Sequence, residues 1–233
     1  MFYKKIGIIC AIEEEKVEVE KQLHNIKTVW EQAGLIFEEG SAGTCTVYLV
    51  TAGIGKVNSA MCTQIMLDRL DPDILINIGM AGALDPTLEQ GDIVISKEAQ
   101  QHDFDCSDLD EPAGLIPRME TSIFQADENL ICLAEKACKT LGLHYLTGKV
   151  VSGDQFIGSG SRKKRLVDIF QGTCCEMEGA AMAHVCFLNR KPWLILRSIT
   201  DKADGNAQLS YPEFKKLATS RTGQLFREMM ERF

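Results

Sequence analysis

The chain has 233 residues, of which 45% are apolar and 25% are charged, a balance typical of a globular protein. With 25 Lys and Arg against 33 Asp and Glu, the formal charge is −8, which argues against a basic face for nucleic acid or an anionic membrane. No stretch approaches the ~18 consecutive apolar residues of a membrane span, and we expect one domain over residues 1–233.

The first half of the chain alternates apolar runs with helical patterns, which predicts strands joined by helices. The expected strands are Ile6–Ile9, Leu35–Glu39, Thr44–Thr51, Ile74–Ile78 and Gly91–Ser96. The expected helices are Glu14–Leu23 and Asn58–Leu70. The run Ile74–Ile78 is short and apolar, as expected of a central strand that is covered on both faces.

The second half of the chain opens with a polar, acidic segment, and we expect a long, functional loop over Gln101–Thr121. Further along, the expected helices are Asn129–Leu141, one opened by Cys175–Ala180, and Tyr211 to about Arg232; the expected strands are Lys149–Ser152 and Leu194–Ile199. This alternation predicts an α/β domain with a mostly parallel or mixed sheet.

Glycines and carboxylates gather where the expected strands end. Ligands of open α/β sheets bind beyond the carboxyl ends of the strands, so these segments are candidate site residues. They are Cys10–Glu15, Ala52–Lys56, Gly79–Ala83, Ser152–Ile157, Cys175–Ala180 and Thr200–Asp204. Glycine lets backbone N–H groups approach a ligand, and carboxylates supply acid, base and diol-binding groups. The set suits hydrolysis of a neutral, polyhydroxylated substrate.

Each of these features also has a purely structural interpretation. Glu13–Glu15 and Glu176–Glu178 could be helix first turns that the helix dipole favours, and Asp201 could be a helix N-cap. The Gly53–Lys56 segment lacks the Walker spacing and could be a tight turn. Three histidines lack metal spacing and are expected to be structural or on the surface: His102, His144 and His184.

The nine cysteines are scattered and mostly lie in apolar runs, which favours reduced thiols in a cytoplasmic protein. No CxxC pair is present, and the adjacent Cys174 and Cys175 lack the spacing of zinc ligands. The cysteines therefore give no sign of a zinc site.

Taken together, the strand-end segments resemble the nucleoside phosphorylase family, and within it the 5′-methylthioadenosine/S-adenosylhomocysteine nucleosidases. The resemblance covers nearly the whole chain in order. The matching segments are Ile6–Glu15, Gly53–Val57, Asn77–Gly82, Gly91–Val94, Val151–Ile157, Glu176–Ala180, Ala183–Cys186 and Arg197–Asp201. The resemblance implies a three-layer α/β/α sandwich around a central, mixed, twisted sheet, with no cofactor and no metal.

The resemblance also implies the roles of individual residues. Glu15 matches the base that activates water, Asp201 the acid that protonates adenine N7, and Glu178 the carboxylate that binds the ribose hydroxyls. Phe156 matches the ring that stacks on adenine, and Ile157 the backbone that contacts the adenine edge. The remaining expected substrate contacts are Gly82, Glu176, Met177, Ile12, Ile54, Met80, Arg197 and Tyr211.

Leu109 and Pro117 fall where a partner subunit closes the pocket in the family, which implies a homodimer. The activity implied is hydrolysis of 5′-methylthioadenosine, S-adenosylhomocysteine and 5′-deoxyadenosine to adenine, in methionine salvage and the recycling of S-adenosylmethionine by-products. Several residues depart from those common in the family and leave the preference for the 5′-substituent open: Met80, Ile12, Tyr211, Leu109 and Glu111.

Three other functions remain open at this stage. A purine nucleoside phosphorylase would need cations for phosphate, for which only Arg197 and Lys56 are candidates, and Glu15 would repel the anion. Another rival among hydrolases is a nucleosidase that prefers futalosine-type substrates or 5′-deoxyadenosine. A non-catalytic nucleoside sensor would have no need to keep all three acids.

Overall fold

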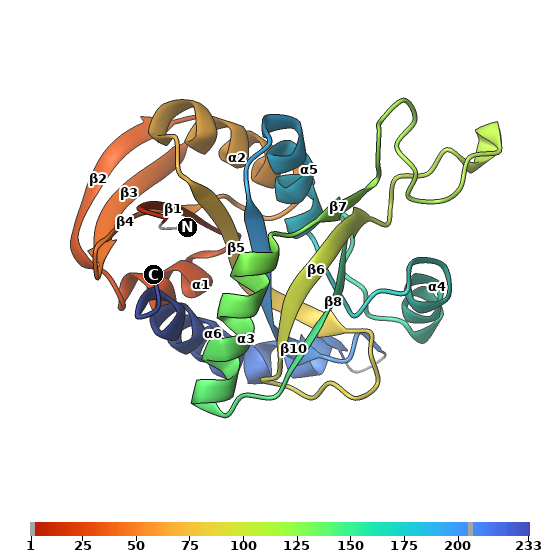
Figure 1. Ribbon diagram of the computed structural model, residues 1–233. Helices are drawn as coiled ribbons and strands as arrows, with labels where there is room; N and C mark the ends of the chain where they lie inside the picture. Colours follow the sequence, from red (N-terminus) through yellow and green to blue (C-terminus); the bar gives the residue numbers. More distant parts are fainter. Residues whose placement is uncertain (1–2, 205–206) are drawn as a thin grey trace.

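The computed structural model describes residues 3–204 and 207–233, which form a mixed β-sheet with helices on both faces (Figure 1). The strands are β1 (Lys5–Cys10), β2 (His24–Gln32), β3 (Leu35–Ala42), β4 (Cys45–Thr51), β5 (Ile74–Ala83), β6 (Ile93–Gln101), β7 (Ile123–Gln125), β8 (Tyr145–Ser152), β9 (Cys174–Glu176) and β10 (Trp193–Asp201). The helices are α1 (Glu13–Glu20), α2 (Lys56–Leu70), α3 (Glu128–Leu141), α4 (Gly160–Phe170), α5 (Gly179–Asn189) and α6 (Ala207–Met230), with a 3₁₀ turn at Ser107–Leu109.

The sheet runs in the order β10-β6-β8-β9-β5-β1-β4-β3-β2. Strands β4, β1, β5 and β10 are parallel neighbours, so their carboxyl ends lie at one edge. The additional pairing of β10 with β5 closes five strands, β5, β10, β6, β8 and β9, into a ring. This closure brings β9 and β10, which are far from β1 in sequence, to the edge at which β1 ends.

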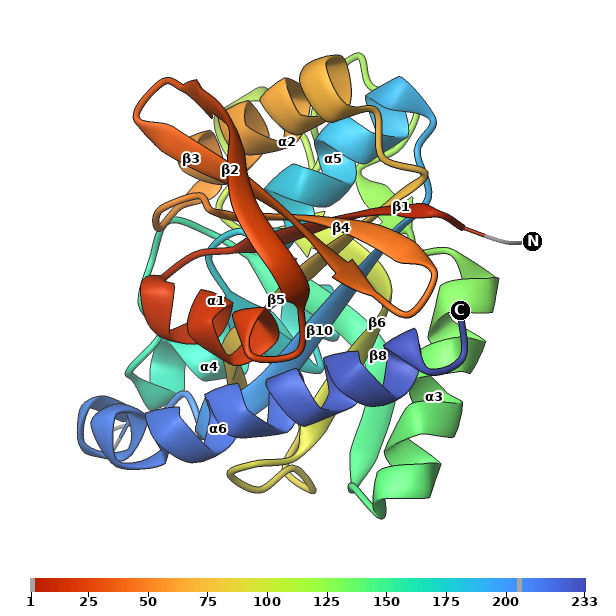
Figure 2. The same ribbon diagram turned by 90° about the vertical axis from the view of Figure 1, so that its left-hand side faces the viewer.

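Helices cover both faces of the sheet, which gives the expected α/β/α layers (Figure 2). Helices α2 and α5 pack together on one face, and α6 packs against α1, α3 and β10 on the other. Strands β5 and β10 are buried along almost their whole length, in agreement with a central position. The fold class predicted from the sequence is therefore confirmed.

Some elements differ from the sequence prediction. Strand β2 was not expected, because its residues are mostly polar and exposed and show no apolar alternation. Helix α4 was not expected either, since its sequence is rich in Lys and Arg. The prediction that Cys175–Ala180 opens a helix is wrong at its start: Cys174–Glu176 is the short strand β9, and α5 begins at Gly179. None of the described helices has both the length and the apolar character needed to cross a bilayer.

Candidate active site

A cavity of about 380 Å³ opens where β1, β5, β9 and β10 end. This volume is within the range of small-molecule pockets. Its walls come from segments distributed between residues 11 and 211. The lining residues are Ala11, Ile12, Glu15, Ile54, Met80, Ala81, Gly82, Gln155, Phe156, Ile157, Cys175, Glu176, Met177, Glu178, Thr200, Asp201 and Tyr211.

Glu15 lies in the first turn of α1, directly after β1, and its buried carboxyl accepts three backbone hydrogen bonds. Oε2 accepts from the N–H groups of Ala11 (2.9 Å) and Ile12 (3.2 Å), and Oε1 from that of Met80 (3.0 Å). Burial raises the pKa of Glu15 above its usual value, while the charge of Arg197 and the three N–H groups oppose this rise. The result is an oriented carboxylate of increased basicity.

Asp201 is the last residue of β10 and is also buried. Its Oδ2 accepts from the Thr200 hydroxyl and its Oδ1 from the Ala203 N–H, both at 2.8 Å. Burial is the main reason that the pKa of Asp201 is raised, and this favours the protonated form that a general acid needs. The ammonium group of Lys163 on α4 holds the same loop through the carbonyl groups of Ala83 and Lys202.

Glu178 lies just before α5 and shares one hydrogen bond with the loop that follows β4. Its Oε1 accepts from the Gly55 N–H at 2.7 Å. Burial, followed by the negative charge of Glu176, raises the pKa of Glu178 to about 8. Its backbone carbonyl accepts from the Ser59 hydroxyl, which ties α5 to α2. The side chain thus keeps an oxygen for which no protein partner is found among the described residues.

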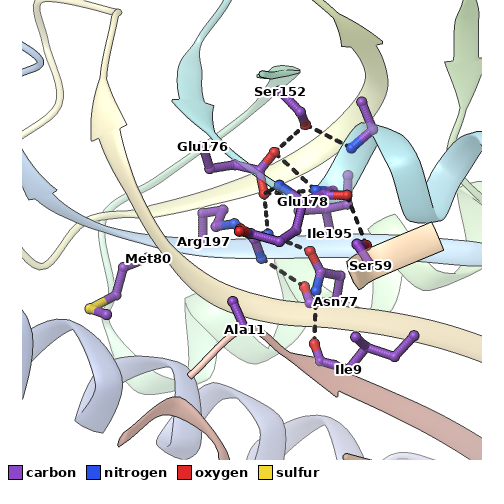
Figure 3. A network of polar contacts seen from close by, with 12 residues as sticks. Ile9, Ala11, Ser59, Asn77, Met80, Ser152, Glu176, Glu178, Ile195 and Arg197 are labelled. Carbon is purple, nitrogen blue, oxygen red and sulfur yellow. Dashed lines mark hydrogen bonds and ion pairs between the residues drawn. The ribbon is translucent and has the colours of Figure 1, made fainter. Parts of the chain in front are cut away.

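Behind Glu178 lies a buried polar network centred on Glu176 and Arg197 (Figure 3). Glu176 accepts hydrogen bonds from Arg197, the Ser152 hydroxyl and the Gly179 N–H. Arg197 also donates to the Asn77 side chain and carbonyl. Both charges are almost fully buried, so removing one partner would cost about 3–5 kcal/mol. The network fixes the start of α5 and thereby the position of Glu178.

Two glycines of β5 make room for two of the carboxyl groups. A Cβ atom on Gly79 would lie 2.7 Å from Glu15 Oε1, and one on Gly82 would lie 2.9 Å from Asp201 Oδ1. Both separations are shorter than real Cβ contacts. The segment of β5 from Gly79 to Gly82 therefore lies close to both carboxyl groups.

The rest of the cavity wall is mostly apolar. Phe156 and Tyr211 stand edge to face, with ring centroids 6.2 Å apart and planes at 85°. Ile157 is buried, whereas Phe156 is 46% exposed and Ile54 is 57% exposed at the open side. An exposed aromatic face beside buried carboxyl groups suits a flat, partly apolar ligand that also carries polar groups.

Most of the site residues predicted from the sequence line this one cavity: Ile12, Glu15, Ile54, Met80, Gly82, Phe156, Ile157, Glu176, Met177, Glu178, Asp201 and Tyr211. Three do not. Arg197 lies behind the wall, where Glu176 and Asn77 take up both of its Nη groups, so a direct contact between Arg197 and a ligand is not supported. Leu109 and Pro117 lie on the segment between β6 and β7, which extends away from the body of the molecule (Figure 1).

The structure also tests the purely structural interpretations of the acidic residues. Glu13 accepts a hydrogen bond from Thr51 and pairs with Lys16, and Glu14 pairs with Lys215, so both make structural contacts at the surface of α1. Asp201 is not an N-cap, because α6 begins six residues later, at Ala207. Ala11, Ala81, Gln155, Cys175 and Thr200 also line the cavity. Each lies in one of the strand-end segments predicted to form the site, but sequence reasoning gave none of them an individual role.

His184 contacts the Gln101 side chain (3.3 Å) and stacks on Phe124, as expected of a structural histidine. His102 is buried, and burial lowers its pKa. Neither lines the cavity. The cavity thus combines the carboxyl groups of Glu15 and Asp201, both close to β5, with that of Glu178 just before α5, and the pKa of each is raised. This arrangement suits general acid–base chemistry on a small molecule.

A family model described as "Phosphorylase superfamily" matches residues 5–231. Among solved structures, the 5′-methylthioadenosine/S-adenosylhomocysteine nucleosidase of Neisseria meningitidis in complex with methylthio-immucillin-A is similar at a TM-score of 0.94 and 31% identity, over 99% of this chain and 100% of that chain. A mutant of Helicobacter pylori MTAN with 5′-methylthioadenosine in the active site is similar at a TM-score of 0.95 and 30% identity, over 100% of both chains.

The futalosine hydrolase of Helicobacter pylori strain 26695 is similar to the same degree, with a TM-score of 0.94 and 30% identity over 99% of both chains. The likeness to solved structures therefore does not separate these two substrate classes.

Proposed function

The chain belongs to the phosphorylase superfamily, and we propose that it is a hydrolase that cleaves the N-glycosidic bond of 5′-methylthioadenosine and S-adenosylhomocysteine, and also of 5′-deoxyadenosine, to release adenine. The observation that carries the proposal is the composition of the cavity wall: it includes the buried carboxyl groups of Glu15, Glu178 and Asp201, and no Lys or Arg is among the described lining residues.

This composition favours water over phosphate as the nucleophile. A phosphate ion needs Arg, Lys or several free N–H groups near the reacting carbon. Lys56 is paired with Asp103, and Arg197 is paired with Glu176. The Met80 N–H, which could meet an anion, is already bonded to Glu15. Phosphorolysis would thus place an anion against an unneutralised carboxylate.

The proposed reaction uses the two carboxyl groups beside β5. Glu15 accepts a proton from a water molecule that attacks C1′, and Asp201 donates a proton to N7 of the departing adenine. Each transfer is worth roughly 10²- to 10⁴-fold in rate. The increased basicity of Glu15 and the raised pKa of Asp201 both support this assignment.

Glu178 is proposed to bind the ribose hydroxyl groups. Its pKa of about 8 means that it holds a proton near neutral pH in the free protein, so it can both donate and accept hydrogen bonds. The positive charge that develops on the ribosyl ring favours the ionised form. Binding and reaction would therefore shift this group toward the carboxylate.

The apolar and aromatic wall is proposed to hold the base and the 5′-substituent. Phe156 offers its ring to adenine, and the backbone of Ile157 lies beside it. Ile12, Ile54 and Tyr211 add apolar surface suited to a methylthio or homocysteinyl group. Futalosine remains the second candidate substrate, because the similarity to a futalosine hydrolase is equally high.

A homodimer is the third part of the proposal. The cavity is open beside Ile54 and Phe156, and Leu109, which is 73% exposed, lies on a segment that extends from the body (Figure 1). A second copy could cover the opening with this segment. The mass of the protein in solution tests this, and the mass of a single chain would contradict it.

The experiment that tests the activity measures adenine released from 5′-methylthioadenosine, S-adenosylhomocysteine and 5′-deoxyadenosine, and hypoxanthine released from futalosine, with and without inorganic phosphate. We expect adenine at a rate that does not depend on phosphate and a free 5′-substituted ribose as the second product. A rate that requires phosphate, with a sugar 1-phosphate as product, would identify a phosphorylase. Release from futalosine alone would favour the second candidate.

A further inference from the structure

Glu178 depends on the Gly55 N–H, and that N–H belongs to a loop whose own sequence does not fix its shape. Gly53 and Gly55 have φ angles of +88° and +99°, a region that only glycine enters readily. Glycine also has the largest backbone freedom to lose, so the loop needs contacts from elsewhere to hold one conformation. The position of the Gly55 N–H is therefore set by groups outside the loop.

Three charged residues provide these contacts, and we call them the α2 clamp: Lys56, Asp103 and Asp154. The Lys56 N–H, next to that of Gly55, donates to Asp154 Oδ1 at 2.8 Å. The Asp154 N–H donates to Asp103 Oδ2 at 2.9 Å. The Lys56 ammonium closes the circuit on Asp103 Oδ1 at 2.5 Å. The start of α2 is thus bound to the loop after β8 and to the end of β6 by three contacts.

The ion pair of the α2 clamp is partly shielded from water, with side-chain exposures of 18% for Lys56 and 13% for Asp103. Although burial opposes it, the Lys56 hydrogen bond lowers the pKa of Asp103, which keeps the pair charged near neutral pH. The Lys56 ammonium also donates to the Gln101 side chain at 3.0 Å. Such a pair is worth more than an exposed one, because solvent screens it less.

Two carboxyl groups consequently accept from consecutive N–H groups at the start of α2: Glu178 from Gly55 and Asp154 from Lys56. Asp154 Oδ1 also lies 3.0 Å from the place that a Cβ atom on Gly55 would take. A shift of the Asp154 carboxyl would therefore release the Lys56 N–H. The neighbouring peptide, whose Gly55 N–H donates to Glu178, could then rotate. The residues after Asp154, Gln155 to Ile157, form the wall proposed for the base.

We infer that Asp154, held by Asp103 and Lys56, is a positioning residue that sets the place of the Glu178 carboxyl and thereby the recognition of the ribose hydroxyl groups. The inference rests on the proposed function, since it assigns the hydroxyl groups to Glu178. It goes beyond it in naming a residue that touches no substrate and acts through a main-chain N–H group. The alternative is that Asp154 merely stabilises the start of α2.

The readout that separates these interpretations is the ratio of kcat/KM for 5′-methylthioadenosine to kcat/KM for its 2′-deoxy counterpart. We expect Asp154→Ala to lower this ratio about tenfold, because sub-ångström displacement of a substrate-binding group has effects of this size. The fall should come from the ribonucleoside, with the 2′-deoxy compound affected about twofold or less. Asp154→Asn keeps an oxygen for the Lys56 N–H and should retain most of the ratio.

A double variant tests whether the effect passes through Glu178. In the Glu178→Gln background, Asp154→Ala should lower the ratio little further, since residues that act as one unit are not additive. Asp168→Ala is the matched control: Asp168 is an exposed acid on α4 that also bonds to a lysine, 2.7 Å away, and it does not line the cavity. It should leave the ratio unchanged.

An unchanged ratio in a folded Asp154→Ala variant, as judged by circular dichroism and thermal unfolding, would overturn the inference and leave the proposed function intact. Additive effects in the double variant would overturn it as well. If Asp154→Ala does not fold, Asp103→Ala, which removes the acceptor for the Asp154 N–H, carries the same expectation and the same criterion. No hydrolysis of any nucleoside by the wild-type protein would instead end the proposed function and this inference together.

Discussion

Three of the buried carboxyl groups that line the cavity, those of Glu15, Asp201 and Glu178, differ in the number of N–H and O–H groups that bond to them. Glu15 accepts three backbone hydrogen bonds, Asp201 accepts one from backbone and one from a hydroxyl, and Glu178 accepts one. Donors stabilise the charged form of a carboxyl group, so Glu15 has the most support for the ionised state that a base needs. Different surroundings thus give the same functional group different proposed tasks.

Neutral isosteres test these tasks directly. Glu15→Gln and Asp201→Asn keep the side-chain volume but remove the proton-accepting or proton-donating group. We expect each variant to fold and to release adenine roughly 10²- to 10⁴-fold more slowly than the wild type. Glu13→Gln, two residues before Glu15 and bonded to Thr51 at the surface, is the control and should keep full activity. Near-normal turnover by either isostere would remove that residue from the mechanism.

Sequence reasoning located the cavity residues that carry the proposed chemistry but not the residues that hold them. Glu15 comes shortly after β1, Asp201 ends β10, and Glu178 lies between β9 and α5; in each segment a carboxylate stands out against apolar neighbours. Asn77 is the only polar side chain of its run, and nothing in one sequence links it to Arg197, 120 positions later. Such long-range pairs depend on the closure of β10 onto β5, which local patterns do not encode.

At the scale of single elements, β5 supports the site through residues that have no side chain. Its glycines at positions 79 and 82 allow Glu15 and Asp201 to approach the strand from within the cavity wall. The strand also supplies the Met80 N–H to Glu15. The strand has ten residues, twice the length predicted from the sequence. The additional residues up to Ala83 pair with β9 and include Gly82, which lies next to Asp201.

A single methyl group should therefore disturb the proposed acid. In Gly82→Ala the new Cβ would meet Asp201 Oδ1 at 2.9 Å and Ala203 at 3.1 Å, so the carboxyl group must move. We expect kcat to fall about 100-fold, with a much smaller change in the thermal unfolding temperature. Gly160→Ala on α4 is the matched control, because its Cβ would have no neighbour within 4 Å. Equal kcat values for the two variants would refute this account.

The elements that escaped sequence prediction did so for different physical reasons. Strand β2 is mostly exposed and pairs only with β3, so its polar sequence carries no burial pattern. Strand β9 has three residues, and it exists because the ring of strands closes around it. Helix α4 has a clear apolar stripe with only Leu166 and Phe170 buried, which the charged residues around it obscure. Burial on two faces made β1, β5 and β10 predictable.

At the scale of the whole molecule, the proposed site lowers stability in a way that depends on pH. Glu178 has a pKa of about 8 in the folded protein against an ordinary value of 4.5. Between these values the unfolded chain is ionised at this residue while the folded protein holds the proton, so folding takes up a proton. The contribution of this group to stability is therefore fully present below pH 4.5 and is lost progressively as the pH rises to about 8.

Replacing the Glu178 carboxyl by an amide should remove this pH-dependent loss of stability. We expect Glu178→Gln to raise the unfolding temperature by about 5 °C at pH 8 and by much less at pH 5, while activity falls. Differential scanning calorimetry at the two pH values measures the difference. An advantage that is equal at both, or larger at pH 5, would mean that Glu178 is ionised in the folded protein across this range.

The first and last described residues of the chain are neighbours: the rings of Tyr3 and Phe233 lie edge to face, 6.0 Å apart. The cavity wall begins at Ala11 and ends at Tyr211, and the long segment between β6 and β7 contributes nothing to it within one chain. The site therefore does not depend on the order in which the wall segments follow one another along the chain. A circularly permuted gene, joined by a short linker across the old termini and opened between β6 and β7, would encode a chain with every wall segment uncut.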